Sequence, residues 1–153
     1  MQHQIIIKEN TFENARKSIR KVQKDEKIII FSSSDDELNR KILEKEQINI
    51  LLLSQSGRKD FQKQKNSGFN HVMAKAAKKK NISIGIFLDE IIEAKSKIEK
   101  SEILARIRQN IKICSKNMLK MKFIQINEKN NRNFYDLKSL GAVLGMPTWM
   151  LEF

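Results

Sequence analysis

Five short apolar runs, each followed by a segment with helical periodicity, constrain the fold of this 153-residue chain. The runs lie at residues 5–7, 28–31, 48–53, 82–87 and 123–126. Near-continuous apolar strands that alternate with helices are typical of a parallel sheet covered by those helices. A closed eight-unit barrel normally needs about 200 or more residues. The pattern therefore predicts an α/β fold with a parallel sheet of about five strands, either open or resembling an incomplete TIM-type (β/α) barrel.

Capping residues and stop signals mark the expected helix boundaries. Ser34 and Glu37 form a capping-box pair that opens a helix ending near residue 46. Gly145 is placed to end the last helix in a left-handed conformation. The polar segment 54–68 is interpreted as a functional insertion within a single domain over residues 1–153. The other helices are predicted at residues 12–22, 69–80, 88–92, 101–120 and 135–144.

The net charge of the chain is +12, and two segments account for it, because the remaining residues sum to −1. Residues 58–80 contain eight Lys and Arg and one acid, which gives +7, and residues 103–122 contain six and no acid, which gives +6. A domain that only has to stay soluble usually mixes its charges, so these blocks predict a surface for a polyanion. The only Trp, Trp149, is far from both blocks in sequence, and no apolar run approaches the roughly 20 residues of a membrane span. Nucleic acid is therefore favoured over a membrane.

The second basic block lies on one predicted helix. Arg108, Lys112 and Lys116 align on the side opposite the apolar stripe, and no acid stands four residues away to pair with them. A solvated helix face is the plain interpretation, but such a face usually includes acids. These three cations are therefore candidates for phosphate contacts.

Arg106 and Asn110 border the apolar stripe of the same helix. A partly buried Arg needs a carboxylate or phosphate partner, and a buried Asn needs its amide satisfied. Two alternatives stay open for Arg106, an ion pair with an acid such as Asp60 or Asp136 and a contact with RNA.

The chain offers little for catalysis. Its two His, His3 and His71, have no metal-ligand spacing, and Cys114 is its only Cys. The acids at 35–37 lie at a helix start, where capping and the helix dipole explain them. Asn70 is the expected cap of the next helix and His71 a hydrogen-bonded structural residue near its start. No catalytic or metal-binding residue is predicted, and the lone thiol suits a reducing, cytoplasmic environment.

Several motifs in fixed order resemble a known family. They are GRKD at 57–60, NSGFNHVMAKAA at 66–77, RIRQN at 106–110 and LGAVLGM at 140–146. Over residues 28–146 the chain resembles ribonuclease P protein component 3, the archaeal member of the thirty-kilodalton ribonuclease P subunit family. Family members usually carry further strand–helix units. Residues 61–65 look like an insertion that splits GRKD from NSGFNHV and adds two lysines.

The resemblance implies a protein subunit that binds ribonuclease P RNA and supports it in removing the 5′ leader from precursor tRNA. In that family the RNA, with magnesium, makes the cut. The protein alone is then not catalytic and holds no cofactor. The implied partners are the RNA, precursor tRNA indirectly, and a second, small α/β protein component, with no membrane.

Charge and resemblance together give two sets of site residues. Strand ends in a parallel sheet gather ligands, which adds the rim loops after the third and fifth strands. Predicted RNA-binding residues are Arg58, Lys59, Lys63, Lys65, Lys75, Arg106, Arg108, Lys112 and Arg132. Predicted structural or partner-binding residues are Asp60, Asn70, His71, Asn110 and Asp136. Two alternatives are a metal-dependent phosphoesterase of a related barrel fold and a protein–protein scaffold that uses an open strand edge.

Overall fold

The computed structural model describes residues 3–152, in which all five strands form one parallel sheet. Its order is β1-β2-β3-β4-β5, and each neighbouring pair is parallel. The strands are β1 (Gln4–Lys8), β2 (Ile28–Ser32), β3 (Ile50–Leu53), β4 (Ser83–Phe87) and β5 (Met121–Ile124). The order never reverses, so every crossover steps the same way, as in a (β/α) barrel and unlike a doubly wound sheet.

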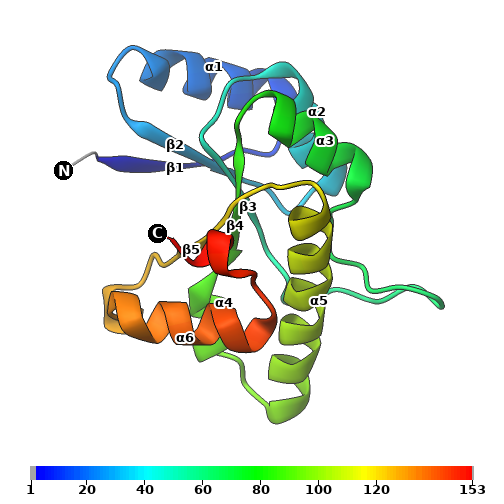
Figure 1. Cartoon of the computed structure of the whole chain (residues 1–153). Coiled ribbons are helices and arrows are strands. Elements are labelled where there is room, and N and C mark those ends of the chain that lie inside the picture. Colours follow the sequence, from blue (N-terminus) through cyan, green and yellow to red (C-terminus); the bar gives the residue numbers. More distant parts are fainter. Residues whose placement is uncertain (1–2, 153) are drawn as a thin grey trace.

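The sheet is open, because β1 and β5 lie at its two ends and the described residues do not pair them with each other. The predicted α/β fold, a five-stranded parallel sheet resembling an incomplete TIM-type barrel, is confirmed. Figure 1 shows α1, α2 and α3 together at the top, α5 upright at the right and α6 across the bottom. The helices are α1 (Phe12–Gln23), α2 (Asp36–Lys45), α3 (His71–Lys79), α4 (Leu88–Ile92), α5 (Lys97–Lys116), α6 (Phe134–Leu144), η1 (Glu128–Asn130) and η2 (Thr148–Leu151).

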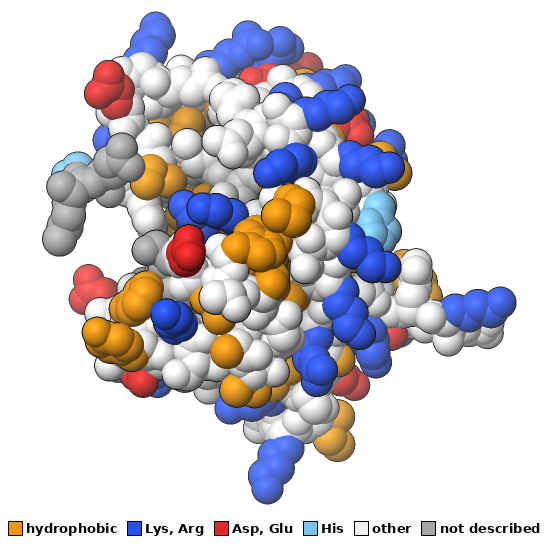
Figure 2. All heavy atoms as spheres, in the orientation of Figure 1, with side chains coloured by type: hydrophobic (Ala, Val, Ile, Leu, Met, Phe, Trp, Pro, Cys, Tyr) orange, Lys and Arg blue, Asp and Glu red, His pale blue; other side chains and the backbone are white. Residues whose placement is uncertain are grey.

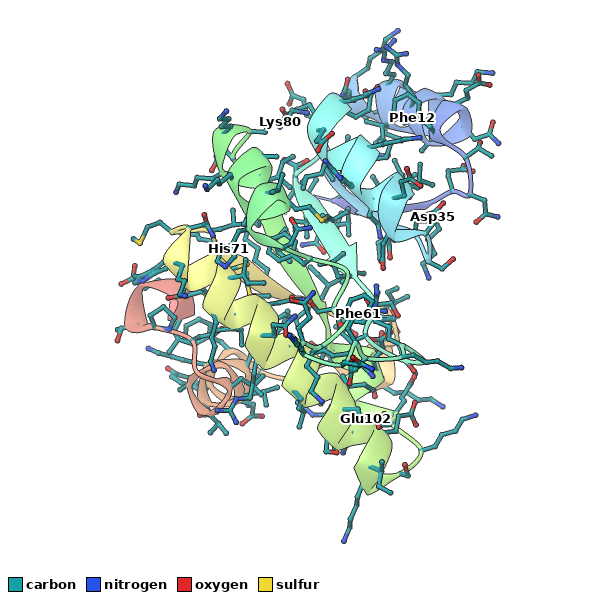
Figure 3. All side chains as sticks on the ribbon, turned by 90° about the vertical axis from the view of Figure 1, so that its right-hand side faces the viewer. Phe12, Asp35, Phe61, His71, Lys80 and Glu102 are labelled. Atoms are coloured by element: carbon teal, nitrogen blue, oxygen red, sulfur yellow. The ribbon has the colours of Figure 1, made fainter. Side chains whose placement is uncertain are left out.

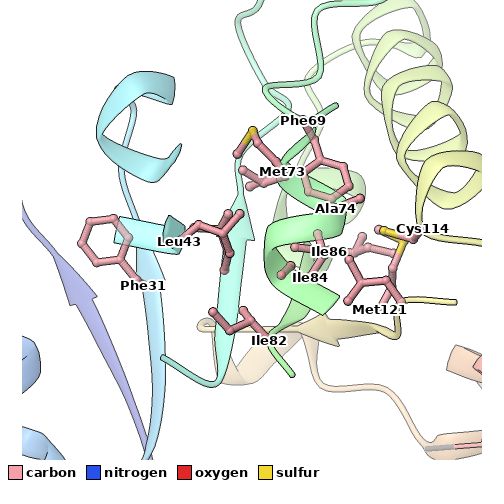
Figure 4. Packing of buried hydrophobic residues seen from close by; sticks show 14 of the residues in the cluster. Phe31, Leu43, Phe69, Met73, Ala74, Ile82, Ile84, Ile86, Cys114 and Met121 are labelled. Atoms are coloured by element: carbon pink, nitrogen blue, oxygen red, sulfur yellow. The ribbon is translucent and has the colours of Figure 1, made fainter. Parts of the chain in front are cut away.

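Alternation along the strands separates two apolar layers. On β3, Leu51 and Leu53 belong to the main core, whereas Ile50 and Leu52 belong to a smaller cluster on the other face. Helix residues such as Cys114 join only the main core, part of which Figure 4 shows. The helices therefore cover one face of the sheet, as right-handed crossovers in a single direction require.

The structure corrects the start of α2. Asp35, not Ser34, is the N-cap, and its Oδ1 accepts from the backbone N–H groups of Glu37 and Leu38 at 3.0 and 3.3 Å. Ser33 Oγ in turn accepts from the Asp35 N–H at 3.1 Å. A carboxylate satisfies two orphan N–H groups and also suits the positive end of the helix dipole, which favours Asp35 over the preceding serine.

The long helix α5 begins earlier than predicted. Ser96 caps it, with its Oγ accepting from the Glu99 N–H at 3.1 Å, so the predicted start at Ser101 is wrong. The helix ends at Lys116, and the chain turns at Met118, where φ is 54°. This early turn lets β5 begin at Met121, two residues before its predicted start.

Candidate nucleic-acid interface

The segment 54–70, the β3–α3 loop, carries the first basic block. It leaves the carboxyl end of β3 and projects beyond α5 (Figure 1). Its outer turn is closed by the Phe61 N–H, which donates to the Gln64 carbonyl at 3.0 Å. A loop of this length needs internal partners for its backbone, and α5, α2 and α4 supply them.

Arg106 of α5 organises the inside of this loop. Its Nε donates to Asp60 Oδ1 at 3.0 Å, its Nη1 to the Gln55 carbonyl at 2.8 Å and its Nη2 to the Arg58 carbonyl at 2.7 Å. Only 3% of the side chain is exposed. A planar guanidinium holds three acceptors at fixed angles, which an ammonium does not. The ion pair with Asp60, one of the two sequence alternatives, is therefore present and gives Arg106 a structural role. Its RNA contact stays a prediction.

Arg58 joins the loop to α2. Its Nη1 and Nη2 donate to the two carboxylate oxygens of Asp36 at 2.7 and 2.8 Å, and its Nε donates to the Ser54 carbonyl at 2.6 Å. The side chain is only 11% exposed. Capping thus explains Asp35 but not Asp36, which corrects the sequence interpretation of the acids at this helix start.

Gly68 passes beside the Arg58–Asp36 pair. Its φ is +71°, and a Cβ there would lie 2.6 Å from Arg58 Nη2 and 2.7 Å from Asp36 Oδ1. A side chain would therefore be strained by the backbone and would also displace a bidentate pair. The glycine of the NSGF motif is required by this close approach.

Asp60 accepts hydrogen bonds from three donors at the base of the loop. Besides Arg106, it accepts from the Asn66 N–H at 3.0 Å and from Lys65 Nζ at 3.2 Å. The hydrogen bond from Arg106, followed by that from Asn66, lowers the pKa of Asp60 from its ordinary 3.8 to about 2. Asp60 thus stays ionised at neutral pH and compensates charge inside the loop.

Gln109 of α5 holds the returning arm of the loop. Its Nε2 donates to the Lys65 carbonyl at 2.9 Å and to Ser67 Oγ at 3.2 Å, and its Oε1 accepts from the Lys65 N–H at 3.1 Å. This exchange imitates a strand pair. The sequence analysis missed Gln109, although its position three residues after Arg106 places it on the neighbouring side of the helix.

Gln55 and Glu90 were also missed. The Gln55 amide donates to the Ser67 carbonyl at 3.0 Å, and the Gln55 backbone N–H donates to Glu90 Oε2 at 2.8 Å. The Ser54 hydroxyl donates to the other oxygen of Glu90. Glu90 lies on α4, immediately after the strand beside β3. Adjacent strand ends in a parallel sheet were therefore the signal for it.

The two basic segments lie side by side. His71 Nδ1, at the start of α3, is 3.1 Å from Asn117 Nδ2 at the end of α5, and Lys78 Nζ donates to the Met118 carbonyl at 2.8 Å. Figure 2 shows Lys and Arg side chains gathered over α5 and the projecting loop. We give the name basic face to six exposed cations of these elements, none of which forms an ion pair among the described residues. They are Lys59, Lys63, Lys75, Arg108, Lys112 and Lys116.

Asn70 and Asn110 occupy different environments. Asn70 Oδ1 accepts from the Met73 N–H at 3.0 Å, which confirms the predicted cap of α3. Asn110 is buried beside Arg106, and its Oδ1 has no hydrogen-bond partner in the described chain. A partner-binding role for either residue remains a prediction.

Arg132 and Asp136 follow β5, and no hydrogen bond or ion pair in the described range joins their side chains to the basic face. Asp89, which the sequence analysis missed, shapes the loop before them. Its Oδ2 accepts from the backbone N–H groups of 126–127 at 2.7 and 3.1 Å, and its Oδ1 accepts from Asn130 Nδ2 at 2.7 Å. Burial opposes ionisation of Asp89, but these hydrogen bonds outweigh it and lower its pKa.

Groups for chemistry are sparse in residues 3–152. No three side chains among His, Cys, Asp and Glu there gather as a possible metal site. Burial raises the pKa of the Cys114 thiol far above its ordinary value, which makes it a poor nucleophile. None of the described helices has the length and apolar character needed to cross a bilayer.

No family model matches the chain. It is 24% identical over 131 residues to Ribonuclease P protein component 3 of Methanothermobacter thermautotrophicus, which covers 86% of this chain and 49% of that protein. The chain thus spans about half the length of this curated relative.

Two solved structures share the fold. A chain in the cryo-EM structure of archaeal Ribonuclease P with mature tRNA superposes with a TM-score of 0.80 at 23% identity, covering 96% of this chain and 62% of that one. A crystal structure of an uncharacterized protein gives a TM-score of 0.59 at 10% identity, over 93% of this chain and 39% of the other. The resemblance to ribonuclease P protein component 3 that the GRKD, NHV and RIRQN motifs predicted is confirmed by a sequence match over most of the chain.

Proposed function

We propose that this chain is an RNA-binding protein subunit of ribonuclease P, which supports the catalytic RNA in removing the 5′ leader from precursor tRNA. The observation that carries the proposal is the basic face, whose exposed cations form no ion pairs within residues 3–152. They stand on α3, on α5 and on a loop that Arg106 and Arg58 hold from behind. The sequence match to a ribonuclease P protein supports the same function.

The face would act by neutralising phosphates. Each phosphate contact by a lysine or arginine releases condensed counterions, which favours binding. Positions fixed in the folded protein lose little side-chain and loop entropy when RNA helices pack against them. Arg58 and Arg106 would act mainly by holding Lys59 and its neighbours in place, because their own guanidinium groups already bind protein acceptors.

The rest of the proposal concerns the assembly. The RNA, with magnesium, would cleave precursor tRNA as the endoribonuclease, and the protein alone would hold no cofactor. A second, small α/β protein component is the expected protein partner, and the open edges of β1 and β5 are available for such contacts. A cytoplasmic location is part of the proposal and agrees with the lone thiol of Cys114.

The test measures affinity for purified ribonuclease P RNA across a salt series. Replacing Arg108, Lys112 and Lys116 by Gln should reduce affinity and flatten the plot of log affinity against log salt by about 0.7–0.9 for each lost phosphate contact. The matched control replaces three exposed lysines of α1 and α2, namely Lys17, Lys21 and Lys41, by Gln.

The control removes the same net charge from other elements. A flatter slope only for the α5 variant supports an RNA surface on the basic face. Equal slopes for both variants would mean that the loss of affinity depends only on the net charge of the protein. If the unaltered chain binds the small protein component but not the RNA, the scaffold alternative replaces the proposal.

A further inference from the structure

A hollow of about 590 Å³ adjoins the basic face. It lies between the tip of the β3–α3 loop, the starts of α2 and α3, and the middle of α5, the side of the molecule that Figure 3 shows with Phe61 and His71 labelled. The residues that line it include Phe61, Gln64, Asn66, Asn70, His71 and Gln109. A hollow of this size, open at the surface, accommodates one flat heterocycle.

Phe61 is an unusual residue for this loop. Its side chain is 58% exposed, although its neighbours in the loop are polar or basic. The ring contributes little to the core, so folding does not explain it. It belongs to the 61–65 segment that separates GRKD from NSGFNHV and is therefore a feature of this chain beyond the shared motifs.

The ring is presented by a fixed turn. The Phe61 N–H donates to the Gln64 carbonyl, and Gln109 holds both backbone groups of Lys65. An aromatic side chain on an anchored turn needs little ordering when a ligand stacks on it.

Amide groups complete the hollow. The side chains of Gln64 and Asn66 form no hydrogen bond within residues 3–152, and Asn70 uses only its Oδ1 there. Such amides donate to and accept from the polar edges of a nucleobase. Unpaired bases in RNA are recognised by this combination of aromatic stacking and edge hydrogen bonds, beside cations that bind the phosphates.

We propose that this hollow binds an unpaired nucleobase of RNA, with the base stacked on Phe61 and its edge facing the amides of Gln64, Asn66 and Asn70. The inference rests on the proposed RNA-binding function and adds a contact that reads the RNA's single-stranded regions. The adjoining Lys63 and Arg108 would hold the phosphates on either side of the base.

The experiment uses two fluorescent single-stranded RNAs of about ten nucleotides, a length within the usual site sizes of single-strand binders. One has a mixed sequence, and the other has the same phosphates but an abasic ribose at every position. Phe61→Ala should weaken binding of the mixed RNA by about 5- to 150-fold, the range for loss of one stacked base. Its salt slope should not change, because no cation is lost.

Three comparisons make the result specific. Phe61→Trp should restore affinity, because a larger ring still stacks. Tyr135→Ala, which removes an exposed aromatic side chain from α6, should leave affinity unchanged. The abasic RNA should bind the Phe61→Ala variant and the unaltered chain equally. Thermal midpoints should agree for all variants, because both aromatic side chains are exposed.

The outcomes separate the two proposals. If Phe61→Ala binds mixed RNA as well as the unaltered chain, or loses affinity equally for the abasic RNA, the base-binding hollow is wrong while the basic face stands. If the unaltered chain shows no salt-dependent binding to either RNA or to ribonuclease P RNA, the proposed function fails and the hollow falls with it.

Discussion

Arg106 and Arg108 stand two residues apart on α5, yet they do opposite things. Arg106 points into the β3–α3 loop and is bound by three protein acceptors. Arg108 points outward, and the described residues offer it no ion pair. Residues i and i+2 of an α-helix point in directions about 200° apart, so neighbouring cations of one basic block face different surroundings. Arg106 and Arg108 contribute equally to the net charge, but Arg106 can hold the loop in place while Arg108 can bind a ligand.

The same division runs through the first basic block. Arg58 is tied to Asp36 and to the Ser54 carbonyl, whereas the adjacent Lys59 is exposed. Inward cations should affect folding stability first and RNA affinity only as a consequence. Outward cations should affect RNA affinity and its salt dependence and leave stability nearly unchanged.

The largest effect is expected for Arg106→Ala. The change removes a buried guanidinium and leaves the Asp60 carboxylate and two loop carbonyls without their donor. Loss of three charge-assisted hydrogen bonds should cost about 3–5 kcal/mol, the upper range for a single substitution. Urea unfolding measures the loss. Arg108→Ala is the matched control in the same helix and should stay within about 0.5 kcal/mol of the unaltered chain. Similar losses for both variants would contradict the division.

The next effect concerns the space beside Arg58. Gly68→Ala should cost about 2–4 kcal/mol, because a left-handed backbone strain is joined by a clash with Arg58 and Asp36. Gly57→Ala is a close control, since its φ of +72° is nearly the same but nothing lies within 4 Å of an added Cβ. That variant should lose only about 1–2 kcal/mol. If chemical denaturation gives the two variants equal stability, the close approach at Gly68 has no energetic consequence.

Periodicity was sufficient to predict the sheet, because apolar runs report burial directly. It was less able to place ends: Ser34 and Ser101 were plausible caps, but Asp35 and Ser96 lie where the chain actually enters the helix. Several neighbouring residues can each cap a helix, and which of them does so depends on the direction from which the preceding loop reaches it. Parallel pairing also requires the neighbouring strand's register, which no local pattern contains.

The site was predicted in part for a similar reason. The apolar stripe of α5 showed that Arg106 borders the core and needs a partner, and Asp60 was one of the acids considered. Gln55 and Gln109 carried no such signal, because an uncharged amide is equally at home in solvent. Their roles depend on loop carbonyls that only the folded chain brings within reach.

A smaller effect is expected when charge is kept but geometry is changed. Arg58→Lys retains the positive charge beside Asp36 but cannot reach both carboxylate oxygens and the Ser54 carbonyl at once. The loss should be about 2 kcal/mol, the scale of a charge-assisted hydrogen bond. Lys59→Arg, its neighbour, should leave the unfolding midpoint in urea unchanged. A fully stable Arg58→Lys would mean that charge alone holds the loop to α2.

The smallest effect is expected for Asp60→Asn, and its size should depend on pH. Because the pKa of Asp60 is lowered to about 2 from 3.8, its ionised form stabilises the folded chain at all pH values above its ordinary pKa. That contribution is lost as the pH falls from about 4 to about 2, when protonation removes the acceptor of Arg106. Asp60→Asn should therefore be less stable than the unaltered chain at pH 6, and the difference should shrink through this window.

Glu102→Gln removes an equal charge from an exposed position on α5 that forms no ion pair in the described chain, so urea unfolding should show no such convergence. If the stability difference between Asp60→Asn and the unaltered chain stays constant down to pH 2, the Asp60 side chain holds the loop by its shape and not by its charge. The inward cations would then not act on the loop through electrostatic attraction to Asp60.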